Sequence, residues 1–226
     1  MNGRMKLHMA VDMAMTADLF LLMGFPLWGM NAHMMAGAGF FLLLLLHHGL
    51  NWWWYAGLSR GRWNGARRLG VAVNLALLVV LFFLLWSSIV LAGPAIGLPP
   101  LGSMRLAREA HMACAYWGFL LMSFHMGMHW DMFQGMARRL APVFPRKGTG
   151  TALAALGTAI ALYGFYALYA RNWADYLFLQ SEFVFFDYEE GAFSFYGDHL
   201  AIMGCAIWCA VKISRFIRNG RIPGRH

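Results

Sequence analysis

The chain has 226 residues, of which 60% are hydrophobic and only 12% are charged, with a net charge of +8. Soluble domains carry about 25% charged residues, so this composition excludes an ordinary soluble enzyme or binding domain. Apolar stretches recur from one end of the chain to the other. We therefore predict an all-α, polytopic membrane protein that forms a single domain over residues 1–226 and has no internal sequence repeat.

Six apolar stretches are long enough to cross a bilayer, which takes about 20 residues per helix. The joints between them hold helix breakers or clusters of charge, as in GPAIGLPP at 93–100. The sequence therefore predicts a bundle of about six membrane helices. The predicted spans cover residues 7–30, 33–58, 69–92, 107–136, 150–172 and 196–217.

The first predicted span holds Asp12 and Asp18 within its apolar run, and no small-residue cleavage site follows it. We therefore expect a retained helix and not a signal peptide. Carboxylates are costly in lipid, so both should face the bundle. There, either one can relay a proton or simply pair with a nearby polar group.

The second predicted span begins at His33 and holds His47 fourteen residues later, with His48 beside it. Ionisable groups in membrane spans are rare and are functional candidates by default. Because His48 points about 100° away from His47 on a helix, we expect it to pack or to form a hydrogen bond. Asn51 lies one turn after His47, and we expect it to orient that imidazole by a hydrogen bond.

The fourth predicted span repeats this spacing, because His111 opens it and His125 follows fourteen residues later. His129 lies eighteen residues after His111, which is five full helical turns. It therefore faces almost the same way and remains an alternative to His125. We favour His125 because its spacing matches that of the second span.

The basic charge of the chain follows the predicted topology. With both termini in the cytoplasm, only Arg105, Arg108 and Arg171 of the 18 lysines and arginines lie on the outer side. This is the distribution of the positive-inside rule, and it argues against a nucleic-acid partner. The outer connection at 173–196 is aromatic and acidic, and it is equally well explained as a docking face for a partner or as a solvated loop.

The second and fourth spans run in the same direction, so their histidines fall at two matching depths. Fourteen residues rise about 21 Å along a helix and return to roughly the same side of it. Facing helices of bundles commonly bind cofactors between them. We therefore predict two bis-histidine sites, His33 with His111 near the outer surface and His47 with His125 nearer the cytoplasm.

A haem iron with two axial histidines fits this arrangement, and two haems would form a path for electrons across the membrane. The chain has no C-x-x-C-H, so covalent c-type attachment is not expected. Arg105 and Arg108 lie next to His111 and are candidate partners of haem propionates. His129 is a candidate for a propionate contact or for a quinone pocket if it is not a ligand.

Several segments together resemble the flavinylation-associated cytochrome family, bacterial membrane proteins formerly classed as a domain of unknown function. The most specific is the H-x-G-x-H of the fourth span. One departure is Met34, where the family often has an acidic residue, and this weakens a proton-handling role at that position. The matching segments are Asp12, His33-x-x-x-Gly37, His47-x-x-Leu50-Asn51-x-x-Trp54, His111, YWGFLLMSFHMGMHW at 116–130, FLQSEFVFFDYEE at 178–190 and LAIMG at 200–204.

The resemblance implies a cytochrome b-like protein with two b haems in a bacterial cytoplasmic (inner) membrane. It also implies electron delivery from the quinol pool to an extracytoplasmic flavin-bearing or other redox partner. The alternative is a proton or metal-ion transporter built from His and Asp residues. We consider it weaker, because a metal site would gather its ligands with carboxylates at one depth.

Overall fold

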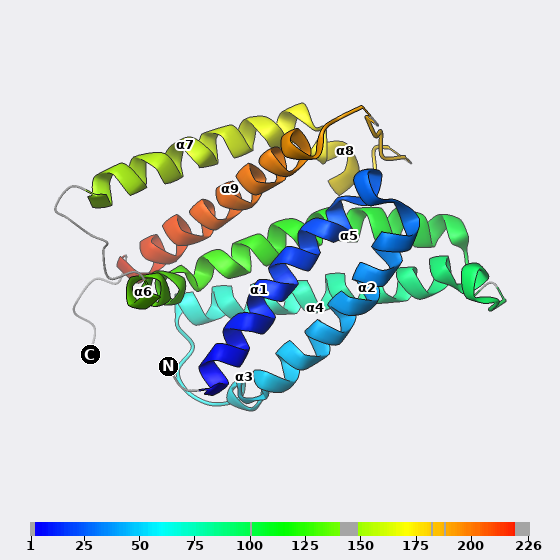
Figure 1. Ribbon diagram of the computed structural model, residues 1–226. Coiled ribbons are helices and arrows are strands. Elements are labelled where there is room, and N and C mark those ends of the chain that lie inside the picture. The colour runs from blue at the N-terminus through cyan, green and yellow to red at the C-terminus, as the bar shows by residue number, and fades with distance from the viewer. Residues whose placement is uncertain (1–2, 100, 141–148, 182, 188, 220–226) are drawn as a thin grey trace. The chain divides into compact units, whose positions relative to one another are not determined.

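The computed structural model describes residues 3–99, 101–140, 149–181, 183–187 and 189–219. These residues form helices joined by short connections, and none of them lies in a strand, so the predicted all-α class is confirmed. Figure 1 shows the helices coloured along the chain from α1 to α9. They are α1 (Gly3–Met23), α2 (Phe25–Leu50), α3 (Trp52–Gly57), α4 (Gly65–Ala92), η1 (Gly93–Ile96), α5 (Met104–Met128), α6 (Trp130–Leu140), α7 (Thr149–Ala170), α8 (Trp173–Leu177) and α9 (Ala192–Asn219).

Four of the described helices are long and apolar enough to cross a membrane. They are α2, the continuous α4–η1 helix, α7 and α9, and they indicate a multi-pass membrane protein in contact with lipid. Helices α1 and α5 have 21 and 25 residues but are more polar. Aspartates interrupt the apolar run of α1, and α5 carries histidines together with Arg105 and Arg108 near its start.

The contacts divide the chain into two compact units. Unit 1 comprises Met1–Trp63 with Phe185–Tyr196, and unit 2 comprises Asn64–Val184 with Gly197–His226. The first turn of α9 therefore belongs to unit 1 and the rest of α9 to unit 2. The single-domain organisation stays a prediction.

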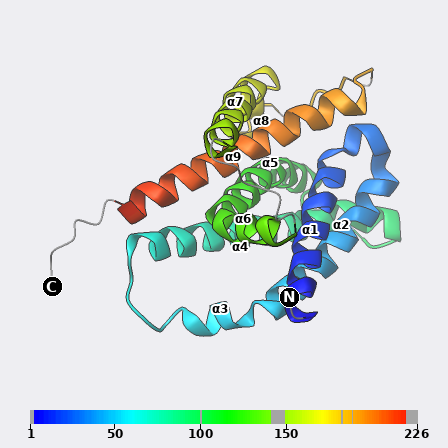
Figure 2. The same cartoon turned by 60° about the vertical axis from the view of Figure 1, so that its left-hand side comes forward.

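Unit 1 is built on the antiparallel pair α1 and α2, which lie side by side in both views (Figures 1 and 2). The two helices meet at Gly24, where a Cβ atom would collide with the Tyr196 hydroxyl and the Trp28 ring. Gly29 interrupts α2 with φ 75°, a conformation that favours glycine. The uninterrupted part of α2 therefore begins just before His33 and continues through His47.

Unit 2 contains a second antiparallel pair, α4 and α5, joined by η1 and a short loop (Figure 1). Side-chain caps begin both helices, because Asn64 accepts a hydrogen bond from the backbone of Arg67 and Ser103 accepts one from Leu106. Gly118 of α5 faces Val80 of α4 at a distance that leaves little room for a larger residue.

Glycines also allow α9 to approach its neighbours within unit 2. A Cβ on Gly164 of α7 would overlap the backbone of Ala201 in α9. A Cβ on Gly127 of α5 would lie 2.7 Å from both the Ala210 side chain and the Ile207 carbonyl oxygen. The packing of α9 therefore depends on glycine at these two positions.

Three predicted spans end earlier than the apolar pattern suggests. The helix expected over 7–30 ends at Met23, because the chain turns at Gly24 and α2 begins at Phe25. The other two each break at a single residue. The helix expected over 33–58 ends at Asn51, and the helix expected over 107–136 breaks at His129. Each of these residues leaves the helical conformation, and a tryptophan begins the short helix that follows, α3 or α6. Apolar composition continues across both breaks, which is why periodicity and hydropathy did not reveal them.

Candidate functional site

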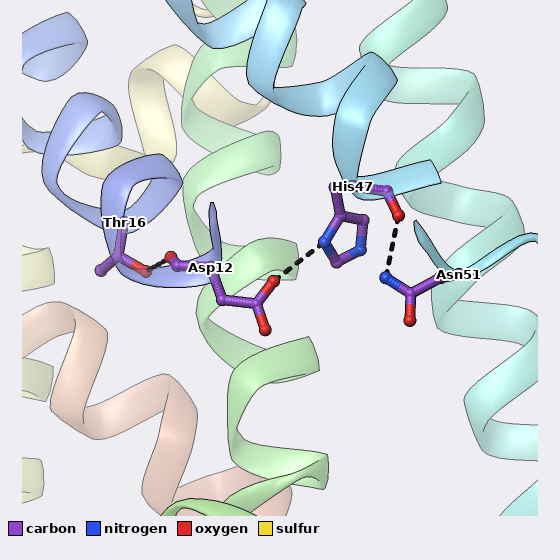
Figure 3. A network of polar contacts seen from close by, with 4 residues as sticks. All are labelled: Asp12, Thr16, His47 and Asn51. Carbon is purple, nitrogen blue, oxygen red and sulfur yellow. Dashed lines mark hydrogen bonds and ion pairs between the residues drawn. The ribbon is translucent and has the colours of Figure 1, made fainter. Parts of the chain in front are cut away.

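His47 forms the best-defined polar contact of unit 1. Its Nδ1 lies 2.9 Å from Oδ1 of Asp12 on α1, and both side chains are just over one quarter exposed. Figure 3 shows the Asp12 carboxyl group facing this ring nitrogen. A carboxylate only accepts, so Nδ1 of His47 carries the hydrogen and donates it. In the neutral ring, the lone pair then lies on Nε2.

Asn51 makes a different contact from the one we predicted. Its Nδ2 donates to the backbone carbonyl of His47, at 2.8 Å, and the partner of the imidazole is Asp12 (Figure 3). Asn51 thus stabilises the end of α2 and supports His47 through the backbone. Thr16 donates to the backbone carbonyl of Asp12 at 2.8 Å and so braces the other side of the contact.

His125 has an equivalent contact in unit 2. Its Nδ1 lies 2.9 Å from Oδ1 of Asn74, which projects from α4. An amide oxygen only accepts, so Nδ1 of His125 donates and its lone pair lies on Nε2. Asn74 was not among the predicted site residues, although a lone amide within the apolar run 69–92 was a signal for it.

His33 is held by the backbone of the neighbouring helix. Its Nδ1 lies 3.0 Å from the carbonyl oxygen of Leu22, near the end of α1. A carbonyl oxygen accepts, so this ring also carries its hydrogen on Nδ1. The Phe25 ring packs edge-on against the imidazole, with centroids 5.5 Å apart, and limits its rotation.

His111 is held by a serine on α4. Its Nδ1 lies 3.2 Å from Oγ of Ser87, and the Ser88 hydroxyl is at the limit of hydrogen bonding, 3.5 Å away. The fully buried Ser87 uses its own hydrogen on the carbonyl of Leu84, at 3.0 Å. Its oxygen therefore accepts from Nδ1 of His111. A serine pair at the end of an apolar span was the only sequence signal for this contact.

The four predicted ligands thus share one protonation pattern, with the hydrogen on Nδ1 and the lone pair on Nε2. Both histidines of α2 contact α1, and both histidines of α5 contact α4. This confirms that the members of each fourteen-residue pair face the same side of their helix. Metal-binding histidines almost always donate their second ring nitrogen to such an acceptor, so these residues fit axial ligation of a haem iron.

His48 makes a different contact, and His129 lies beside His125. Nδ1 of His48 lies 2.6 Å from the hydroxyl of Tyr55, a group that can donate or accept, so the contact does not fix where the ring hydrogen lies. His129 ends α5, and its ring centroid is 4.9 Å from that of His125. The structure thus pairs Nδ1 of His47 with a carboxylate and Nδ1 of His48 with a hydroxyl. It gives His125 the amide acceptor on α4.

The predicted propionate partners lie at the start of α5. Arg105 is largely exposed, and its Nε lies 3.0 Å from Oε1 of Glu109 one turn later. Arg108 is exposed as well. Among the described residues, no three side chains of His, Cys, Asp or Glu gather in the manner of a metal site.

No family model, curated protein or solved structure matches the chain. Fold and site together define an all-α, multi-pass membrane protein. Its distinguishing feature is a set of four histidines, on two helices, that are each held through Nδ1 by the neighbouring helix.

Proposed function

We propose that this protein is a membrane-bound b-type cytochrome that carries electrons across the membrane through two bis-histidine haems. The observation that carries the proposal is the shared protonation of His33, His47, His111 and His125, each with an acceptor at Nδ1. One such histidine is common in helix bundles. Four of them, at matched fourteen-residue spacing on two helices, are the ligand set that two six-coordinate haems require.

Each neighbouring helix performs one task in this proposal, which is to hold an imidazole so that Nε2 can bind iron. Asp12 and Asn74 hold the inner pair, His47 and His125, whereas the Leu22 carbonyl and Ser87 hold the outer pair. Haem supplies the one-electron chemistry when it is bound. The chain supplies the ligands, their orientation and an apolar surrounding.

The inner ligand of α5 is His125 in this proposal and not His129. The contact between Nδ1 of His125 and Asn74 matches the contact between His47 and Asp12. His129 leaves the helical conformation at the end of α5. Its position beside His125 suits a propionate or a quinone contact.

We assign the protein to a bacterial cytoplasmic membrane with six spans and both termini inside. The support is the distribution of basic residues and the family resemblance of the histidine-bearing segments. On the same basis, the proposed electron donor is a quinol, and the proposed acceptor is an extracytoplasmic flavin-bearing or other redox protein. Arg105 and Arg108 at the outer end of α5 remain proposed partners of anionic propionates.

A proton or metal-ion transporter is the second candidate, and the Asp12–His47 contact is the observation that favours it. Carboxylate and imidazole groups in direct contact within the membrane are typical of proton relays. Such a transporter would need no haem.

An optical spectrum of the purified protein separates the two functions. A cytochrome should show a Soret band and, after reduction with dithionite, the α band of a b haem, which the pyridine haemochrome identifies. A protein that contains no haem after expression with adequate haem supply would contradict the proposal. Proton or metal-ion uptake by vesicles containing such a haem-free protein would then support the transporter.

A further inference from the structure

The two helix pairs α1–α2 and α4–α5 share a pattern of identical residues at equivalent positions. When Asp12 is aligned with Asn74, α1 and α4 begin at equivalent glycines. Val11 and Val73 are then equivalent and both buried. The identical pairs are Gly3/Gly65, Leu7/Leu69, Ala10/Ala72, Val11/Val73, Ala14/Ala76, Leu19/Leu81, Phe20/Phe82 and Leu22/Leu84.

The second helices of the two pairs match as well, in a different register. When His33 is aligned with His111, His47 falls on His125 and the tryptophans that begin α3 and α6 coincide. The loop between α4 and α5 is longer than the turn between α1 and α2, which accounts for the change of register. The identical pairs are Ala32/Ala110, His33/His111, Met34/Met112, Phe41/Phe119, Leu42/Leu120, Leu43/Leu121, His47/His125, Gly49/Gly127 and Trp52/Trp130.

The two helix ends also have the same backbone geometry. Asn51 has φ −103° and ψ 20°, and its equivalent His129 has φ −96° and ψ 12°. The carbonyl of each accepts a 2.9 Å hydrogen bond from the residue three positions later, Trp54 or Met132. The expectation that the chain has no internal repeat is therefore wrong, and the repeated element is a pair of helices with two histidines.

The hydrogen bonds of the histidines are equivalent in the two copies. His47 and His125 donate to Asp12 and Asn74, which occupy the same position in the repeat, both at 2.9 Å. At the other end of each helix, His33 donates to the carbonyl of Leu22. In the second copy, Ser87 is inserted between His111 and the carbonyl of Leu84, the residue equivalent to Leu22.

Among the residues that hold the histidines, the copies differ in charge at the position shared by Asp12 and Asn74. A hydrogen bond to a carboxylate is roughly twice as strong as one to a neutral acceptor, and such a partner makes a histidine a more basic metal ligand. The amide of Asn74 holds His125 in the same orientation without this charge.

From this difference, we propose that Asp12 and Asn74 are equivalent positioning residues of a duplicated helix pair, and that the Asp12 carboxylate makes His47 the stronger electron donor of the two inner ligands. The inference rests on the proposed haem function. The two histidines of the inner haem would then differ in how strongly they donate electrons to the iron. Asp12 would lower the reduction potential of this haem by stabilising the oxidised iron.

The test compares Asp12→Asn, Asp12→Leu and the reciprocal Asn74→Asp in the full-length purified protein. Asp12→Asn reproduces the second copy, so it should retain both haems and raise the midpoint potential of one. Asn74→Asp should lower the potential of the same haem. Asp12→Leu removes the acceptor and should reduce the haem content by up to half. Asp18→Asn is the matched control, because it removes a carboxylate from the same helix.

The results are read from haem content, redox titration and electron paramagnetic resonance of the oxidised protein. The inference is overturned if Asp12→Asn leaves both midpoint potentials unchanged, or if Asp18→Asn shifts one as much as Asp12→Asn does. It is also overturned if Asp12→Leu retains full haem with wild-type potentials. Absence of haem from the wild-type protein would instead overturn the proposed function, so the two failures are distinguishable.

Discussion

At the scale of single residues, the position of the ring hydrogen carries the argument. An imidazole in a membrane span is costly unless its polar atoms are satisfied. Each of the four proposed ligands satisfies Nδ1 with an acceptor from the helix beside it. The acceptors differ in kind, since they are a carboxylate, an amide, a hydroxyl and a backbone carbonyl. What they share is that each holds the ring and places its lone pair on Nε2.

Substitution of single histidines tests this assignment. His47→Ala and His125→Ala should each lower the haem content of the purified protein by about half, because each would remove one proposed ligand of the inner haem. His48→Ala is the matched control, since it removes a neighbouring imidazole that bonds Tyr55, and it should retain both haems. If His129→Ala lowers the haem content by about half and His125→Ala does not, the inner pair has been assigned incorrectly.

At the scale of helices, close packing in unit 2 depends on glycine, and the repeat supplies a matched comparison. Gly127 and Gly49 occupy equivalent positions, and Gly127 lies against α9. A side chain at Gly127 would meet the Ile207 backbone, whereas nothing lies within 4 Å of a Cβ on Gly49. The same residue type thus has different structural importance in the two copies.

Gly127→Ala should therefore destabilise the protein, by about 1–3 kcal/mol on the scale of overpacked sites, whereas Gly49→Ala should have little effect. Thermal unfolding of the two detergent-solubilised variants checks this. Equal melting temperatures would show that α9 does not approach α5 as closely as described.

A polar network joins α7 to α9 within unit 2. Asp198 accepts from Nε of Arg171 and from the hydroxyl of Tyr163, both at 2.7 Å. The side chains of Arg171 and Asp198 are less than one fifth exposed, so an unpaired charge there is costly.

Asp198→Ala should lower stability by about 2–3 kcal/mol, somewhat below the cost of breaking a fully buried pair. Arg171→Ala combined with Asp198→Ala should recover part of the loss, because no unpaired charge remains. A double-mutant cycle from unfolding data measures this coupling, and strictly additive effects would contradict it.

At the scale of the whole molecule, the number of spans remains a prediction. Helices α2, α4–η1, α7 and α9 are apolar enough to cross the membrane, whereas α1 carries Asp12, which holds His47, and α5 carries His111 and His125 themselves. Our proposal places α1 and α5 in the membrane as well. Their polar side chains are then satisfied by hydrogen bonds within each helix pair, between Asp12 and His47 in one and between the α5 histidines and Ser87 and Asn74 of α4 in the other.

Reporter fusions test whether α1 crosses the membrane. If it does, the amino terminus and a fusion after Arg62 lie on the cytoplasmic side, and a fusion after Leu98 lies outside. Cytoplasmic activity for the first two and periplasmic activity for the third are expected. Activity of the amino-terminal and Arg62 reporters on opposite sides would show that only one of α1 and α2 spans the membrane.

Much of this organisation could be predicted from the sequence, because apolar runs and the spacing of histidines are local properties. The helices, the paired histidines and their common face follow from periodicity alone. The acceptors Asn74 and Ser87 could not be assigned, since a polar residue in an apolar run does not reveal which residue on another helix it meets. The repeat was missed for a related reason, because a loop of different length shifts its second half.

The central claim is that this single chain binds two b haems through four histidines. The most direct measurement is the haem-to-protein ratio of the purified chain, combined with electron paramagnetic resonance of its oxidised form. We predict two haems per chain, both low-spin with two histidine ligands. A chain without haem, or one whose haem is predominantly high-spin and five-coordinate, would contradict the account.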